Sequence, residues 1–269
     1  MKKSIAGLLI AGALFLAFNP MVQAGGNADK NALTLKVGAT PVPHAELLNL
    51  IRDDLRRQGV TLNVVEFTDY VQPNMALLSG DIDANFFQHL PYLDSNAEWS
   101  EKLVSAFGVH VEPFGLYSRR YRTLDDLPNG ATIAIPNDPS NGGRALLLLQ
   151  ANGLITLRSD SGLRATPRDI TSNPKNLRFR ELEAALLPRA LDDVDAATIN
   201  GNYALQSGFN PVQDSLIIEG AESPYVNIVV VQKGKEDDPL IVALKNALLS
   251  QKVKDHINST YNGGVVAVY

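Results

Sequence analysis

The sequence predicts an α/β protein with two lobes that face each other across a cleft. Three observations lead to this prediction: strand and helix patterns alternate along the chain, the alternation fills two blocks, and one more strand and helix follow them. Alternating strands and helices are typical of parallel sheets covered by helices. The simplest packing returns the C-terminal piece to the first block, so that two crossovers join the lobes. The predicted first lobe comprises residues 33–115 and 228–269, and the second comprises residues 116–227.

The first block begins with a strand–helix–strand unit, in which the strands are nearly always parallel and the crossover right-handed. In its first strand, Leu35 and Val37 lie on one face, and the following helix has a single apolar stripe that ends at Gly59. A short helix closed by Gly80 and a third strand come next. The predicted elements of this block are strand 33–39, helix 45–58, strand 61–67, helix 69–79 and strand 83–87.

The same alternation recurs in the second block and continues to the C-terminus. The last predicted helix is long and amphipathic, and it is interrupted or frayed near Gln251. The predicted elements are strand 132–136, helix 143–152, strand 177–182, short helix 186–192, strand 195–199, helical turn 203–207, strand 226–232 and helix 239–261.

The composition is that of an ordinary globular protein, because 45% of the 269 residues are hydrophobic and 20% are charged. With 24 Lys and Arg against 29 Asp and Glu, the net charge of −5 gives no reason to expect nucleic acid as a partner. The chain contains no cysteine. This excludes disulfides, thiolate nucleophiles, cysteine-ligated metals and a lipid attached to an N-terminal cysteine.

The first 24 residues are typical of a secretory signal peptide. Lys2 and Lys3 form a positively charged start, residues 4–18 form an apolar run, and small or compact residues precede a cleavage site after Ala24. The apolar run is shorter than the roughly 20 residues that a membrane-spanning helix needs, although an uncleaved anchor is the alternative. Residues 25–32 then form a flexible leader, and the sequence predicts an exported, periplasmic protein without a membrane anchor.

A polar, glycine-rich loop over residues 136–144 leads from a predicted strand into a helix. The free N–H groups at a helix start attract anions, and Arg144 in the first helical turn adds a guanidinium fork that matches a carboxylate. Arg144 and Asn141 could therefore form a carboxylate clamp. The alternative is a solvated arginine after an ordinary capping loop, and these residues alone do not decide between the two.

A second polar and aromatic segment, residues 85–94, follows the third predicted strand at the edge where open α/β sheets bind their ligands. Phe87 and His89 suit a ligand with an apolar body and a polar end. Because side chains alternate along a strand, one of Phe86 and Phe87 is expected to face the core and the other the cleft. The alternative is a pair of core phenylalanines and a capping histidine.

Three further polar residues lie at predicted strand ends or crossovers. Asn202 and Asn227 offer both donor and acceptor atoms, which suit a zwitterion with an ammonium and a carboxylate group. Glu112 lies just before the first crossover and could meet the ammonium group. The alternative is turn chemistry for each asparagine and a surface carboxylate for Glu112.

The sequence lacks the common motifs of nucleotide, metal and hydrolase sites. It has no P-loop, no dinucleotide-binding glycine fingerprint, no His-Glu-x-x-His and no Gly-x-Ser-x-Gly. The four histidines, His44, His89, His110 and His256, do not form a cluster with metal-ligand spacing. We therefore expect no cofactor, no metal site and no catalytic residue.

Several long segments together resemble the NlpA/MetQ family of methionine-binding proteins that serve ABC importers. The resemblance covers nearly the whole chain after the predicted signal peptide, and its segments include FFQHLPYLD, VEPFGLYS, IPNDPSNGGRALLLLQ, TINGNYA, ESPYVNIVV and YNGG. It implies a two-lobed periplasmic binding protein fold of type II that closes around a free amino acid, with L- or D-methionine as the expected ligand. It also implies a methionine-type ABC permease as partner, and a monomer is the default expectation.

The resemblance implies a set of ligand contacts as well. They are Tyr70, Phe87 and His89 in the first lobe, Asn141, Arg144 and Asn202 in the second, and Asn227 at the crossover, to which we add Glu112. Family members are usually lipoproteins anchored through a cysteine after the signal peptide. This chain departs from that pattern, because Ala24 and Gly25 stand there and no cysteine is present.

Three alternatives to methionine uptake stay open. The chain could bind another amino acid or a short peptide, or be a receptor for signalling or chemotaxis rather than uptake. It could also be a dehydratase or lyase of small carboxylates, with His89 and Glu112 as acid and base and Arg144 holding the substrate carboxylate. The lack of a paired-carboxylate or nucleophile–base motif favours a binding protein over an enzyme.

Overall fold

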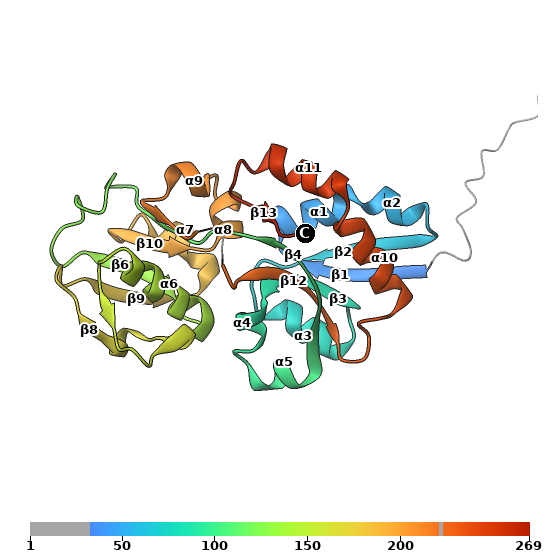
Figure 1. Ribbon diagram of the computed structural model, residues 1–269, viewed down its shortest axis with the longest axis horizontal. Helices are drawn as coiled ribbons and strands as arrows, with labels where there is room; N and C mark the ends of the chain where they lie inside the picture. The colour runs from blue at the N-terminus through green and yellow to red at the C-terminus, as the bar shows by residue number, and fades with distance from the viewer. Residues whose placement is uncertain (1–32, 221–222) are drawn as a thin grey trace, which may run out of the picture. The chain divides into compact units, whose positions relative to one another are not determined.

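Two β-sheets organise the part of the chain that the computed structural model describes, residues 33–220 and 223–269 (Figure 1). The predicted signal peptide and leader lie outside these residues. The chain passes from the first sheet to the second through residues 112–114 and returns before residue 226. The protein is therefore a two-lobed α/β protein, as the sequence predicts. The boundaries of the lobes, to the residue, stay a prediction.

The first lobe is built on a six-stranded mixed sheet. Its strands, in spatial order, are β13 (Val266–Ala267), β4 (Leu103–Val111), β12 (Val226–Gln232), β3 (Ala84–His89), β1 (Leu33–Ala39) and β2 (Val60–Glu66). β1 pairs in parallel with β2 and β3, whereas β12 runs antiparallel to β3 and β4, and β13 runs antiparallel to β4. The expectation of a parallel sheet is therefore wrong for three of the five strand pairings of this sheet. The reason is that β12 enters from the second lobe and runs back between β3 and β4.

The strand β4 is absent from the predicted elements, although it is the longest of the described strands. Its pairing with β12 shifts register at two points. These irregularities, together with Gly108 inside the strand, obscure the alternation that the sequence analysis relies on. β4 ends at Val111, directly before Glu112, and so delivers that carboxylate to the junction of the lobes.

Helices cover both faces of the first sheet (Figure 1). Phe86 packs in the cluster on one face and Phe87 in the cluster on the other, which confirms that these neighbours point in opposite directions. The helices on the face of Phe86 are α1 (Glu46–Leu50), α2 (Arg52–Arg56), α10 (Pro239–Leu248) and α11 (Gln251–Thr260), and those on the face of Phe87 are α3 (Gln72–Ser79), α4 (Leu90–Leu93) and α5 (Ala97–Lys102).

Two of the predicted helices are each split into two. The helix predicted over residues 239–261 breaks before α11, because Ser250 adopts an extended conformation and its side chain accepts a hydrogen bond from the N–H of Val253. The helix predicted over residues 45–58 is interrupted between α1 and α2 at Ile51. The short segment η1 (Pro41–Ala45) directly precedes α1.

The second lobe is built on a five-stranded sheet, whose strands in spatial order are β11 (Ile217–Ile218), β5 (Gly115–Tyr117), β10 (Ala196–Ile199), β6 (Thr132–Pro136) and β9 (Arg178–Leu182). β10, β6 and β9 are parallel, and β5 is antiparallel to both of its neighbours. The remaining elements are α6 (Pro139–Ala151), β7 (Thr156–Leu157), η2 (Gly162–Arg164), η3 (Pro167–Asp169), β8 (Ile170–Ser172), η4 (Ala184–Leu186), α7 (Leu187–Ala190), α8 (Gly201–Gln206) and α9 (Pro211–Asp214).

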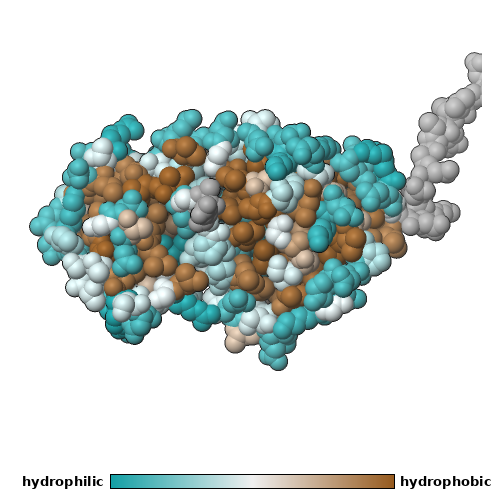
Figure 2. Space-filling view, viewed as in Figure 1, coloured by the Kyte–Doolittle hydropathy of each residue, from teal (hydrophilic) through white to brown (hydrophobic). Residues whose placement is uncertain are grey.

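Apolar side chains of α6 pack against this sheet and stabilise it. Leu146 and Leu149 are fully buried and pack in one cluster with Ile133 and Ile135 of β6. Within the described residues, none of the helices has both the length and the apolar character needed to cross a bilayer. On the face shown in Figure 2, hydrophilic residues lie along most of the rim and apolar residues lie within both lobes.

Candidate functional site

One cavity between the two lobes gathers all eight residues that the sequence analysis singles out. The space between protein atoms there is about 330 Å³, part of it open to solvent. The first sheet contributes the ends of β3 and β12, and the second lobe contributes α6 and the start of α8. The predicted residues that line the cavity are Tyr70, Phe87, His89, Glu112, Asn141, Arg144, Asn202 and Asn227, and the four residues that were not predicted are Gln88, Tyr92, Asn200 and Gly201.

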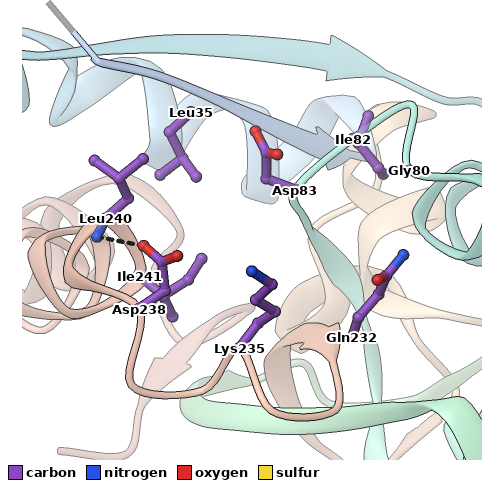
Figure 3. Close-up of a pocket in the computed structure, with 9 residues that line it drawn as sticks. All are labelled: Leu35, Gly80, Ile82, Asp83, Gln232, Lys235, Asp238, Leu240 and Ile241. Atoms are coloured by element: carbon purple, nitrogen blue, oxygen red, sulfur yellow. Dashed lines mark hydrogen bonds between the residues drawn. The ribbon is translucent and has the colours of Figure 1, made fainter.

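A larger pocket, of about 550 Å³, lies in the first lobe (Figure 3). Its acidic groups are engaged in local structure. Asp83 accepts a hydrogen bond from the N–H of Lys36 at 2.7 Å, and Asp238 caps α10 by accepting from the N–H of Leu240 at 2.9 Å (Figure 3). None of the eight predicted residues lines this pocket. We therefore take the cavity between the lobes as the candidate site.

His89 connects the two lobes. Its Nδ1 accepts a hydrogen bond from the N–H of Tyr92 at 3.2 Å and caps α4, while its Nε2 lies 3.2 Å from Oδ1 of Asn141 on α6. Because Nδ1 accepts, Nε2 carries the proton and donates to Asn141. His89 is thus both a capping histidine and a cleft residue. Burial, together with the nearby charge of Arg144, lowers the pKa of His89 to about 3.

Aromatic rings form one wall of the cavity. The ring centroid of Tyr70 lies 5.8 Å from those of Phe87 and Tyr92 and 4.9 Å from that of Tyr203. The hydroxyl of Tyr70 donates to Oδ1 of Asn202 at 2.5 Å and so links the wall to α8. Burial raises the pKa of Tyr70 well above its usual value, which keeps the hydroxyl neutral. The wall therefore offers apolar ring faces to a ligand.

Arg144 lies in the second turn of α6, because the helix begins at Pro139 and not at Gly143 as predicted. A proline at the first helical position favours such a start, and Asp138 caps it by accepting from the N–H of Asn141 at 2.8 Å. The prediction that Arg144 lies in the first turn is therefore wrong. Arg144 is only 3% exposed, so the alternative of a solvated arginine is also wrong.

Among the described residues, two of the three guanidinium nitrogens of Arg144 have hydrogen-bond acceptors and the third has none. Nε and Nη2 donate to the two carboxylate oxygens of Glu219, the first at 3.0 Å, and Nη2 also donates to the backbone oxygen of Glu112 at 3.0 Å. Cζ lies 4.1 Å from the ring centroid of Tyr225 and 5.0 Å from that of Phe114. Among the described residues, Nη1 has no hydrogen-bond acceptor. Two N–H donors of a fixed cation thus remain for an anion in the cavity.

Three asparagines of the second lobe form a polar side of the cavity. Oδ1 of Asn141 accepts from Nδ2 of Asn200 at 2.9 Å, while Nδ2 of Asn141 donates to both carboxylate oxygens of Asp138. Within the described part of the chain, Oδ1 of Asn200 and Nδ2 of Asn202 are buried without a hydrogen-bond partner. A buried polar atom without a partner costs about 1–3 kcal/mol. A polar ligand that satisfies both atoms would therefore stabilise the closed cavity.

Glu112 forms a buried cluster with two histidines. Its Oε1 lies 3.2 Å from Nε2 of His44 and 2.9 Å from Nε2 of His110, and Nε2 of His44 also lies 3.0 Å from Oδ1 of Asn227. Glu112 is 5% exposed, so the alternative of a surface carboxylate is wrong. The sequence predicts no histidine cluster with metal-ligand spacing; the structure brings His44 and His110 together with Glu112, so that three potential ligand atoms lie within 4.8 Å of one another.

Gly201 is the unpredicted lining residue with the clearest structural role. A Cβ at this position would lie 2.7 Å from Cβ of Glu112, a distance at which one of the two must move. Glycine thus lets α8 approach Glu112, whose carboxylate accepts a hydrogen bond from the N–H of Asn202. The local sequence Asn-Gly-Asn after a strand is compatible with many turns, so only the long-range contact reveals this requirement.

Acid is expected to destabilise the protein through three buried histidines. Burial lowers the pKa of His44 to about 4 and those of His89 and His110 to about 3. Unfolded histidines titrate near 6.5, so as the pH falls below about 6.5 the unfolded chain binds up to three more protons and the free energy of unfolding decreases. Burial raises the pKa of Glu112, which opposes this trend by one proton.

Calorimetric melts between pH 7 and pH 5 measure this dependence. We expect the melting temperature to fall with pH, and His89→Gln to flatten the slope by removing one of the three histidines. A melting temperature that stays constant over this range in the unmodified protein would contradict the assignment of three neutral, buried imidazoles.

The sequence is similar to those of known proteins along most of its length. The family model described as NlpA lipoprotein matches residues 35–269. The chain belongs to the NlpA lipoprotein family. It is 47% identical to the membrane lipoprotein TpN32 of Treponema pallidum over 87% of this chain and 88% of that protein. It is 42% identical to the methionine-binding lipoprotein MetQ of Bacillus subtilis over 97% of this chain and 98% of that protein.

Solved structures share the fold of this NlpA family member. The structure of a nutrient binding protein from Burkholderia cenocepacia bound to methionine matches with a TM-score of 0.84 and 45% identity, over 87% of this chain and all of that one. The family resemblance and the two-lobed fold that the sequence analysis infers are therefore confirmed.

Proposed function

We propose that this member of the NlpA family binds free methionine, L or D, and delivers it to an ABC importer. The observation that carries the proposal is the cavity between the lobes, where a buried guanidinium and a buried carboxylate face an aromatic wall. A zwitterion with an apolar side chain is complementary to all three. The Bacillus subtilis relative is named as methionine-binding and the Burkholderia cenocepacia structure holds methionine, which supports this ligand over other amino acids and short peptides.

We assign the ligand carboxylate to the free Nη1 end of Arg144, together with the unpartnered Nδ2 of Asn202. A charge-assisted hydrogen bond contributes about 1.5–3 kcal/mol. Glu219 and Tyr225 already hold the guanidinium in place, so little side-chain entropy is lost on binding. Asn141 then acts through its neighbours, because its amide is engaged by Asp138.

We assign the ligand ammonium to Glu112, with Oδ1 of Asn200 and of Asn227 as neutral acceptors. The thioether chain would lie against Tyr70 and Phe87, where a sulfur–aromatic contact contributes about 0.3–1.5 kcal/mol. Together with the carboxylate contacts, and less the cost of closure, these contributions correspond to micromolar to nanomolar affinity, about −8 to −12 kcal/mol.

Hinge closure would couple binding to recognition by the permease. Direct hydrogen bonds from Tyr70 to Asn202 and from His89 to Asn141 join the lobes at the cavity. A ligand that satisfies the buried polar atoms between them favours the closed form. The closed form presents a continuous surface of both lobes to a permease, and we expect the protein to act there as a monomer.

We further propose that the protein is exported and acts without a lipid anchor. The predicted signal peptide ends at Ala24, and the chain has no cysteine to which a lipid could be attached, in contrast to its relatives named as lipoproteins. N-terminal sequencing of the protein secreted by an expressing cell would give Gly25 as its first residue. A start at Met1 would contradict cleavage.

Native mass spectrometry of the purified protein, followed by calorimetric titration of ligand-free protein, tests the function. We expect a mass increment of one methionine, micromolar or tighter binding, and recovery of chemically unchanged methionine. Lys235→Ala, which alters the pocket in Figure 3, is a matched control and should leave the affinity unchanged. A folded protein that binds no methionine, or that converts it into a product, would overturn the proposal.

A further inference from the structure

Two buried histidines lie behind the cavity without lining it. His44 in η1 and His110 in β4 are each 0% exposed, and neither belongs to the cavity wall. Both direct an imidazole nitrogen at the same carboxylate oxygen of Glu112. None of the ligand contacts proposed above uses them, so their function must be exerted through Glu112.

The hydrogen bonds of His44 fix its tautomer. Its Nε2 faces two acceptors, Oε1 of Glu112 at 3.2 Å and Oδ1 of Asn227 at 3.0 Å, and so carries the proton. Its Nδ1 accepts from the hydroxyl of Thr40 at 2.8 Å. The ring is therefore a neutral donor whose orientation is set from both ends.

His110 is the neutral imidazole that donates to Glu112. Its Nε2 donates to Oε1 of Glu112 at 2.9 Å, while within the described residues its buried Nδ1 has no partner that could stabilise a second proton. Phe86 packs edge-on against both imidazoles, with centroid distances of 4.6 Å to His44 and 5.4 Å to His110. The pair is thus rigid as well as neutral.

We propose that His44 and His110 are positioning residues for amine recognition, which hold the Glu112 carboxylate ionised and leave its remaining lone pairs for the ligand ammonium. This inference rests on the proposed function. A carboxylate favours its charged form when it accepts hydrogen bonds, and here the N–H groups of His110 and Asn202 donate to Glu112 while the N–H of His44, bonded to Asn227, lies 3.2 Å from the same carboxylate oxygen. The other titratable or charged groups that face Glu112 are Arg144, Tyr70 and Tyr261.

The spacing of these groups is that of hydrogen bonds and not of metal ligands. Ligands at about 2.0–2.1 Å from a tetrahedral zinc ion lie about 3.3 Å or more apart. Oε1 of Glu112 lies closer than this to both imidazole nitrogens, at 2.9 Å and 3.2 Å. Nε2 of His44 is also shared with Asn227, which uses its proton.

Calorimetric titration with methionine and with 4-(methylthio)butanoate tests the proposal. The second compound keeps the carboxylate and the thioether of methionine but lacks the amine. His110→Leu should weaken methionine binding by about ten-fold or more and leave the affinity for the desamino compound unchanged. His110→Gln, which can restore an N–H donor, should recover most of the loss. His44→Leu and His44→Gln should behave in the same way.

A pH profile and measurements in a second variant background distinguish a positioning role of His110 from an effect on folding. In His110→Leu the methionine affinity should be lost at a higher pH on acidification than in the unmodified protein, because the carboxylate protonates more readily. In a Glu112→Gln background, His110→Leu should have no further effect on methionine binding.

Three results would overturn the inference. They are unchanged methionine affinity in His110→Leu, equal losses for both ligands, and a zinc-induced rise in the melting temperature that His110→Gln abolishes. If the unmodified protein binds both ligands equally, this inference fails while the proposed function stands. If it binds neither, the proposed function fails as well.

Discussion

Replacing Arg144 by alanine is expected to lower the affinity for methionine by about 100-fold or more. The guanidinium is buried and held in place by Glu219 and Tyr225. Among the described residues that line the cavity, it is the only cationic group. Truncating one partner of a buried, hydrogen-bonded charge pair costs about 2–5 kcal/mol. A single aromatic contact contributes about 0.3–1.5 kcal/mol, so Phe87→Leu should cost less. Titration calorimetry under one set of conditions compares the two variants.

The effect on binding can be separated from an effect on stability. Arg144→Ala leaves the carboxylate of Glu219 without its cation, and an uncompensated charge of this kind is strongly destabilising. The double variant Arg144→Ala/Glu219→Gln should therefore regain thermal stability without regaining affinity. Arg168→Ala removes an exposed arginine of the second lobe and serves as the control. Wild-type affinity in either Arg144 variant would show that the carboxylate binds elsewhere.

Local sequence patterns predict the strand–helix units of this fold and the strand β12, but not the strand β4 or the direction of β12 in the first sheet. β1 and β2 follow from alternation and from the helix stop at Gly59, and their parallel register is as expected. β4 and the antiparallel direction of β12 do not follow, because β4 shifts register along β12 and β12 reaches its place only after the chain has returned from the second lobe. Pairing between segments so distant in sequence leaves no mark in the local pattern of either strand.

The residues of the site also fall into those that local sequence predicts and those that it does not. Arg144 and His89 are predictable because each stands in a polar segment next to a predicted strand, where ligands of α/β sheets bind. Glu219, which is 75 residues from Arg144 and binds its guanidinium, gives no local indication of that role. Gly201 is required only because Glu112 lies against it. Residues whose roles depend on a distant side chain are the ones that the sequence analysis misses.

Gly143→Ala is expected to destabilise the protein although it adds a single methyl group. A Cβ at this position would lie 2.2 Å from the backbone oxygen of Leu163 and 2.9 Å from its carbonyl carbon. Backbone atoms cannot rotate out of the way as a flexible side chain can, so α6 and η2 must separate. Overpacking of this kind costs about 1–3 kcal/mol, and each kcal/mol lowers the melting temperature by about 2–4 °C in a protein of this size.

The same substitution should also weaken methionine binding, because Gly143 immediately precedes Arg144 on α6. Gly220→Ala is the matched control: its Cβ would meet no atom of the described residues within 4 Å, so both melting temperature and affinity should be retained. A lower melting temperature with unchanged affinity would mean that Glu219 and Tyr225 suffice to hold the guanidinium. If Gly143→Ala changed neither quantity, the close approach of α6 to η2 could not be what positions Arg144, and the clamp would depend on its contacts within the cavity alone.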